Sequence, residues 1–160
     1  MQAGIQFARA HVVSFSITLS AVVLSIFAVT YADIISGASS VASSTNVTIT
    51  QLTIAKPTDT AEGDVMHAAI AVNGGSPVVI TPPTGWSLIL RTDNSSHTAG
   101  ASYWKVAGAS EPSSYTWTID SQTRAVGGIT RYSGVDTSNP IDAFAGDTGA
   151  SNTSVAPSIT

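Results

Sequence analysis

Short runs in which apolar and polar residues alternate fill the chain from Val47 onward. Gly, Pro, Asn and Asp separate these runs at intervals of roughly 10 to 15 residues, a spacing typical of a β-sandwich or barrel. The clearest alternation places Tyr115, Trp117 and Ile119 on one side of a strand and Ser114, Thr116 and Thr118 on the other. The pattern therefore predicts an all-β fold, an antiparallel β-sandwich of the jelly-roll or immunoglobulin-like type, with these three side chains in its core.

Two runs predict strands with special features. The apolar phase of the run 47–54 changes across Gln51, which predicts a bulge or a switch of the strand to another sheet. The run 64–72 is apolar on both faces, so we expect a central strand that is covered on both sides.

Two further patterns predict where large side chains lie. Trp86, Leu88 and Leu90 are spaced to share one face of a strand. Gly127 and Gly128 interrupt a predicted strand over 125–133 and would leave a flat patch. We expect the ring of a neighbouring Trp, at position 104 or 117, to lie on that patch.

An apolar N-terminal segment precedes the β-rich region. Residues 1–11 are polar and carry a positive charge, and residues 12–29 form an apolar run, which is the order of a secretory signal peptide. Small residues follow at the spacing that signal peptidase requires. The same run, at about 1.5 Å per residue, comes close to spanning a bilayer as a helix. Residues 1–32 are therefore predicted to be a hydrophobic helix that acts as a signal peptide or a membrane anchor.

The remaining domain boundaries follow from composition. Residues 33–46 are rich in Ser and Ala and are predicted to form a flexible linker. The sandwich domain then occupies residues 47–160. Its final run, 155–160, has the pattern of a strand that has only begun, so we expect the intact domain to need two or three further strands.

Charge and cysteine content exclude several classes of function. Only 10% of the residues are charged, the formal net charge is −4, and no Lys/Arg cluster occurs. Nucleic-acid binding is not expected, because phosphate neutralisation needs a basic patch. The chain contains no cysteine, which rules out disulfides and thiolate chemistry.

Catalytic arrangements are not evident in the sequence. There is no G-x-S-x-G motif, and after residue 32 only His67 and His97 are available as histidine bases. Glu62 and Glu111 are the only glutamates, and both lie in predicted loops, so a facing pair of carboxylates for glycoside hydrolysis is not expected. We therefore predict that the protein is not an enzyme.

Two sets of residues are candidate sites. Asp136, Asn139 and Asp142 offer oxygen atoms to a calcium ion, although the same residues are also typical of turns without an ion. No other cofactor is expected. The aromatic rings that could contact a glycan, if they are exposed rather than in the core, are those of Trp86, Tyr103, Trp104 and Tyr132.

Four motifs in a fixed order carry a resemblance. They are ITPPTGW at 80–86, YWKVAGASEP at 103–112, YTW at 115–117 and YSGVDTSNPID at 132–142. Together they resemble a module of bacterial secreted, cell-surface and some phage-associated proteins, and the resemblance covers about residues 52–160. It implies a β-sandwich, often beside other extracellular repeats, in a chain that continues beyond residue 160. It implies no catalytic residue.

Three functions stay open at this point. The first is a non-enzymatic extracellular or cell-surface module for adhesion, glycan contact or spacing, which would contact a surface glycan or a protein through the loops 76–85, 92–100 and 134–140. The second is a self-associating subunit or decoration domain of a filament, virion or envelope layer. The third is an accessory domain of a secreted hydrolase. Membrane contact is expected only through residues 12–29, if they are not removed.

Overall fold

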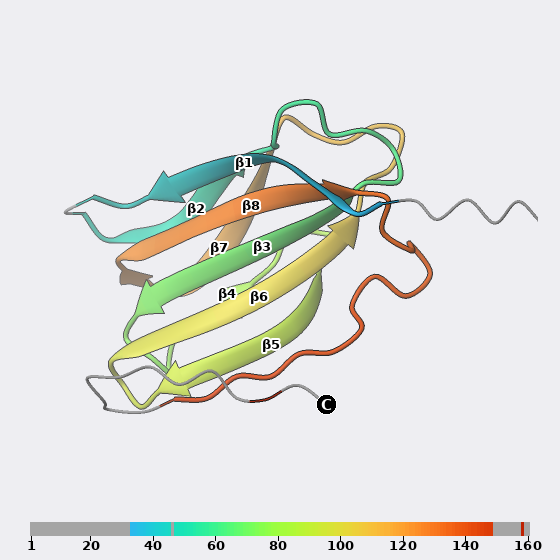
Figure 1. Ribbon diagram of the computed structural model, residues 1–160. Coiled ribbons are helices and arrows are strands. Elements are labelled where there is room, and N and C mark those ends of the chain that lie inside the picture. Colours follow the sequence, from blue (N-terminus) through green and yellow to red (C-terminus); the bar gives the residue numbers. More distant parts are fainter. Residues whose placement is uncertain (1–32, 46, 149–157, 159–160) are drawn as a thin grey trace, which may run out of the picture. The chain divides into compact units, whose positions relative to one another are not determined.

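The fold is seen in a computed structural model that describes residues 33–45, 47–148 and 158. The predicted leader and most of the predicted last strand lie outside these residues. The described residues contain no helix, so none that could cross a membrane, and their eight strands form two antiparallel sheets (Figure 1). The all-β, antiparallel prediction is confirmed, and the arrangement is consistent with a sandwich.

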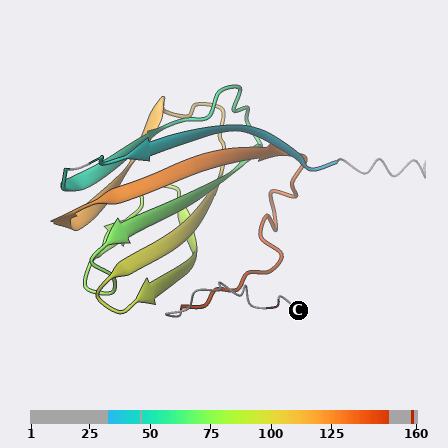
Figure 2. The ribbon, with the colours of Figure 1, turned by 60° about the vertical axis from the view of Figure 1, so that its left-hand side comes forward.

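The larger sheet has five strands in the order β1-β8-β3-β6-β5. Figures 1 and 2 show the smaller sheet, in the order β2-β7-β4, against one face of the larger one. The strands of the larger sheet are β1 (Ile35–Ser43), β3 (Val65–Asn73), β5 (Ser87–Asn94), β6 (Thr98–Val106) and β8 (Ala125–Ser133). Those of the smaller sheet are β2 (Ile49–Ala55), β4 (Ile80–Thr81) and β7 (Ser114–Thr123).

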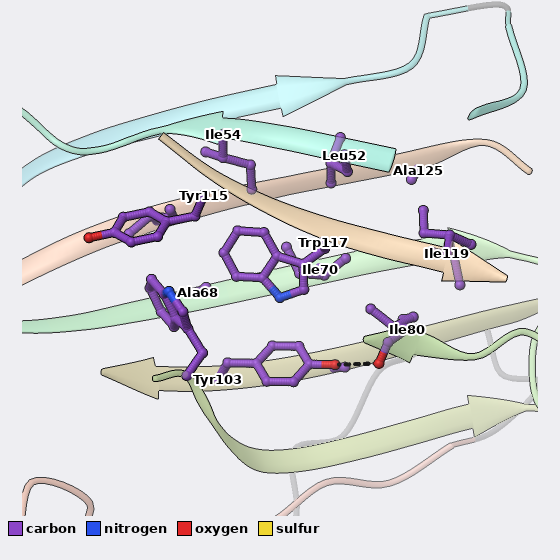
Figure 3. Packing of buried hydrophobic residues seen from close by; sticks show 14 of the residues in the cluster. Leu52, Ile54, Ala68, Ile70, Ile80, Tyr103, Tyr115, Trp117, Ile119 and Ala125 are labelled. Atoms are coloured by element: carbon purple, nitrogen blue, oxygen red, sulfur yellow. Dashed lines mark hydrogen bonds between the residues drawn. The ribbon is translucent and has the colours of Figure 1, made fainter. Parts of the chain in front are cut away.

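Side chains of both sheets form one core (Figure 3). Tyr115, Trp117 and Ile119 of β7 are all buried, as their alternation predicted. The ring of Trp86 meets those of Tyr115 and Trp117 edge to face, with centroids 5.1 and 5.2 Å apart. Such contacts between large rings dominate the burial that holds two sheets together.

The prediction of a flexible linker over 33–46 is wrong for most of that segment. Residues 35–43 form β1, which pairs with β8 along its length. The hydroxyl groups of Ser39 and Thr130 are 2.8 Å apart across this pair. Composition alone misled the prediction, because the edge of β8 supplies backbone hydrogen bonds that small side chains do not prevent.

The strand β3 is central, as predicted, and Val65 at its start is buried on the outward side, but further along the strand only one face is covered. Met66, Ala68 and Ile70 are buried against the smaller sheet, whereas Ala69 and Ala71 are exposed. Within the described residues no second layer packs on this side. Both faces of β3 therefore consist largely of apolar residues, but only the inner face is buried along the whole strand.

Register shifts explain the other differences from the predicted pattern. The expected bulge in the first run is confirmed by a shift between Ile49 and Gln51. A second shift, between Leu88 and Leu90, was not foreseen: Leu88 pairs with Tyr103 and Leu90 with Ser102, so the two leucines take different faces. Trp86, just before β5, is buried, whereas Leu88 is 54% exposed. The prediction that these residues share one face is therefore wrong.

The glycine patch in β8 is occupied by aliphatic side chains and not by a tryptophan. A Cβ atom added to Gly127 would lie 2.6 Å from Cδ1 of Ile70 and 3.0 Å from Cδ1 of Ile54. On the other face, a Cβ atom on Gly128 would lie 3.3 Å from Cγ1 of Val41. The two glycines therefore allow side chains to approach the backbone of β8 closely, as predicted. These side chains are branched aliphatic ones from three neighbouring strands, not a tryptophan ring.

Candidate functional site on the outer face of the larger sheet

The face of the larger sheet that points away from the smaller one, here called the outer face, is the most distinctive surface of the described domain. Successive side chains of a strand point to opposite faces. Because Met66, Ala68 and Ile70 point into the core, His67, Ala69 and Ala71 of β3 lie on the outer face. The strand pairings then place their neighbours in β1, β8, β6 and β5 on the same face.

Small side chains form a shallow trough along the middle of the outer face. The trough has a volume of about 470 Å³. Its sides are formed by Val41 of β1 and Leu90 of β5, and its floor is lined by Gly128, Ala69, Ala71, Gly100 and Ser102. A floor without bulky side chains lets an extended ligand lie flat along the direction of the strands.

Two aromatic residues lie beyond one end of this trough. Trp104 of β6 pairs with His67, and Tyr132 of β8 pairs with Val65, so both flank β3. Both rings are half-buried. From the spacing of strands and residues in a sheet, their Cα atoms are roughly 12 Å apart.

Polar groups without formal charge lie beside the two rings. Thr130 of β8 pairs with His67 and shares a hydrogen bond with Ser39. Burial lowers the pKa of His67 from its ordinary value of 6.5. The imidazole is therefore neutral at physiological pH, with one ring nitrogen that donates a hydrogen bond and one that accepts.

The outer face is also free of charged side chains at the strand positions that point outward. The charged residues of β5, β6 and β8 that lie in ion pairs are directed elsewhere, in the pairs Arg91–Asp93, Lys105–Glu111 and Arg131–Asp64. A ligand that approaches the outer strands therefore meets rings, hydroxyl groups, an imidazole and small apolar side chains. This chemistry suits a neutral partner.

Only two of the four aromatic candidates are placed to contact a ligand. Trp104 and Tyr132 lie on the outer face, whereas Trp86 and Tyr103 are buried at 6% and 2% exposure. The Tyr103 hydroxyl donates a hydrogen bond of 3.3 Å to the carbonyl of Ile80, and burial raises the pKa of this phenol. The prediction of ligand contact is wrong for Trp86 and Tyr103, because their rings are buried in the core between the two sheets.

The calcium candidates lie in the segment that follows β8. Asp136, Asn139 and Asp142 are all exposed, and the Asp136 carboxylate accepts a 2.9 Å hydrogen bond from the amide of Ser138. This bond is turn chemistry of the kind that Asp side chains commonly provide. In the part of the chain that the structure describes, no three His, Cys, Asp or Glu side chains form a group suited to a metal ion. Calcium binding stays a prediction.

The predicted contact loops are shorter than expected. The range 76–85 includes β4, and 92–100 is largely the ends of β5 and β6, joined by a tight turn in which Ser95 has a φ of 50°. The range 134–140 is a loop, as predicted, and the chain then passes β5, where Gly146 packs against Leu90 and Thr92 (Figure 1).

Glu111 has a structural role in the described domain. Although desolvation opposes the charged form, hydrogen bonds from the Gly108 amide, Lys105 and the Tyr115 hydroxyl lower its pKa. Burial, and then the hydrogen bond to and the charge of this carboxylate, raise the pKa of Tyr115. Glu111 is thus held by three donors, which is what a structural carboxylate requires.

Sequence reasoning missed the trough itself. The sequence feature that could have indicated it is the small size of the residues that alternate with buried ones in β3 and β6. In the sequence, such strands cannot be distinguished from strands that are buried on both faces. Comparisons of the chain with protein-family models, curated proteins and solved structures found no match. The function must therefore be inferred from the outer face.

Proposed function

We propose that this protein is a non-enzymatic β-sandwich module, of the immunoglobulin-like or jelly-roll type, that binds a neutral glycan on its outer face. One observation carries the proposal: Trp104 and Tyr132 lie half-exposed on an uncharged sheet face, with the hydroxyl of Thr130 and the neutral imidazole of His67 beside them. The faces of aromatic rings attract the weakly positive C–H groups of a sugar, and hydroxyls and imidazole hydrogen-bond to its oxygens.

The absence of charge narrows the class of glycan. An acidic polysaccharide would gain affinity from Lys or Arg side chains, and the outward strand positions of the outer face carry neither. A neutral polysaccharide does not need such charged contacts for its affinity. The trough provides space for the sugar units that extend beyond the rings. We propose an extended, uncharged polysaccharide as the ligand.

The proposed location is the cell exterior. It is supported by the order of charge and hydrophobicity in residues 1–29 and by the motifs that resemble secreted and cell-surface modules. A glycan ligand fits that location, because polysaccharides of envelopes and extracellular matrices are found there.

The test is calorimetric titration of the full-length chain with neutral gluco-, manno- and chito-hexasaccharides. We expect at least one to bind, and Trp104→Ala to weaken its affinity tenfold or more. Tyr132→Phe should retain most of the affinity and Tyr132→Ala should not, because stacking needs the ring. Leu88→Ala, an exposed apolar position away from the trough, is the matched control. Failure of all three glycans to bind, or equal binding by Trp104→Ala, would overturn the proposal.

A second candidate function is that of a subunit in an assembly. It is favoured by Val41, which is 82% exposed on the edge strand β1, and by Val126, 50% exposed beside it. Exposed edges and apolar side chains of this kind promote contact between copies. A sedimentation coefficient that rises with protein concentration and returns to the monomer value in Val41→Lys would support this function over the first.

A further inference from the structure

The trough on the outer face continues into a second pocket at the end away from the two aromatic rings. This pocket has a volume of about 340 Å³, and Ala71 and Val126 line both the pocket and the trough. Trp104 pairs with His67 near the start of β3, whereas Asn73, the last residue of β3, lines the second pocket. The rings, the trough and the second pocket therefore form one continuous strip along β3.

The second pocket, here called the Arg124 pocket, differs from the trough in its chemistry. Arg124 is exposed and takes part in none of the three ion pairs found among the described residues. Asn73 and Thr98 pair with each other across β3 and β6, and both are exposed. A guanidinium, an amide and a hydroxyl group all form hydrogen bonds with the hydroxyl groups of a sugar. The polar residues that line the pocket are Ser43, Ser44, Thr45, Asn73, Thr98 and Arg124.

The strip is longer than a short oligosaccharide. From His67, which is level with Trp104, to Asn73 the strand covers roughly 20 Å, at about 3.3 Å per residue. One or two sugar units on the rings do not reach the Arg124 pocket, whereas six units in an extended chain do. Val41 and Leu90 form the sides of the trough, so a chain that follows the strands meets only the small side chains of the floor.

We propose that the outer face binds a long stretch of a single polysaccharide chain parallel to its strands, with the Arg124 pocket as a second subsite. One end of the bound stretch stacks on Trp104 and Tyr132, and its middle lies over the trough. The other end forms hydrogen bonds with Arg124, Asn73 and Thr98. This inference rests on the proposed function and specifies its ligand as an extended chain of several sugar units, not a mono- or disaccharide.

The first experiment measures how affinity depends on the length of the sugar. The full-length chain is titrated calorimetrically with gluco-, manno- and chito-oligosaccharides of two, three, four and six units. In the series that binds, we expect the affinity to rise at least tenfold from the trisaccharide to the hexasaccharide. An affinity that stops rising at the trisaccharide would overturn the inference and leave the proposed function intact. If no oligosaccharide binds, the proposed function and this inference both fail.

The second experiment separates the two subsites by substitution. Arg124→Gln, at an exposed side chain, should weaken hexasaccharide binding about tenfold, because charge-assisted hydrogen bonds are lost, and should leave trisaccharide binding unchanged. Trp104→Ala should weaken both. Lys56→Gln, which removes the same charge just after β2 in the smaller sheet, is the matched control and should affect neither. Hexasaccharide binding that is equal in Arg124→Gln and Lys56→Gln would refute the second subsite.

The third experiment locates the bound sugar and tests for another occupant. In NMR spectra, the hexasaccharide should shift the signals of the Thr98 amide and the Asn73 side-chain amide, and the trisaccharide should not. Unchanged signals with the hexasaccharide would overturn the inference. Sedimentation velocity of the same samples should show monomers. Copies that associate and are not separated by the hexasaccharide would mean that a second copy covers the Arg124 pocket, which would also overturn it.

Discussion

The two faces of β3 show how one strand serves two purposes. Both faces are made of residues that avoid charge, yet Met66, Ala68 and Ile70 are buried and Ala69 and Ala71 are exposed. The inner face contributes to stability because it packs against the rings of β7. The outer face packs against little, and its small residues instead leave a trough. Apolar composition therefore indicates burial only when another layer is present to cover the face.

The largest expected effect comes from the inner face. Trp117→Ala removes a fully buried ring and should lower the free energy of unfolding by about 3–5 kcal/mol. Leu88→Ala, at an exposed position, should change it by less than about 0.5 kcal/mol. Urea unfolding followed by circular dichroism measures both. Similar losses in the two variants would show that the ring of Trp117 does not hold the sheets together.

Substitution of the two adjacent glycines of β8 allows the packing on the two faces of the larger sheet to be compared at neighbouring positions. Gly127→Ala forces a methyl group to within 2.6 Å of Ile70 and should cost about 1–3 kcal/mol. Gly128→Ala meets its nearest atoms at 3.2 and 3.3 Å and should cost less. Thermal unfolding of the two variants would show the order, and a greater loss for Gly128→Ala would reverse the assignment of faces.

The pH dependence of stability tests how far His67 is buried on the outer face. Its pKa is lowered by burial, so the unfolded state binds a proton at a higher pH than the folded state does. Stability contributed by the neutral imidazole is thus full above 6.5 and falls as the pH drops below that value. His67→Gln should lose less stability than the wild type between about pH 7 and pH 5. Parallel pH profiles would mean that the imidazole is freely solvated.

The smallest effect on stability is expected from a charge placed in the trough. Ala71→Lys should change the free energy of unfolding by less than about 0.5 kcal/mol, because this position is exposed. The same change should weaken glycan binding, since it adds a charge and bulk to the floor. Val47→Lys, at an exposed position outside the trough, should leave binding intact. A large loss of stability in Ala71→Lys would show that the floor is covered.

Much of the site was visible in the sequence only as residue types. Trp104 and Tyr132 were candidates together with Trp86 and Tyr103, and periodicity could not separate the two pairs. The separation depends on which side of each chain segment meets the smaller sheet. A shift of one residue turns a side chain to the other face, and local sequence carries little information about it.

The sequence by itself determined the all-β character, the core positions of Tyr115, Trp117 and Ile119, the first bulge and the low charge. These are local or compositional properties, set by alternation and by residue type. Only the tertiary structure decided that residues 35–43 form a strand and that, within the described part of the chain, β3 is uncovered at Ala69 and Ala71 and β7 pairs on one side only along residues 114–117. Each of these depends on whether a distant segment supplies hydrogen bonds or buried area, and such pairing is a property of the assembled chain.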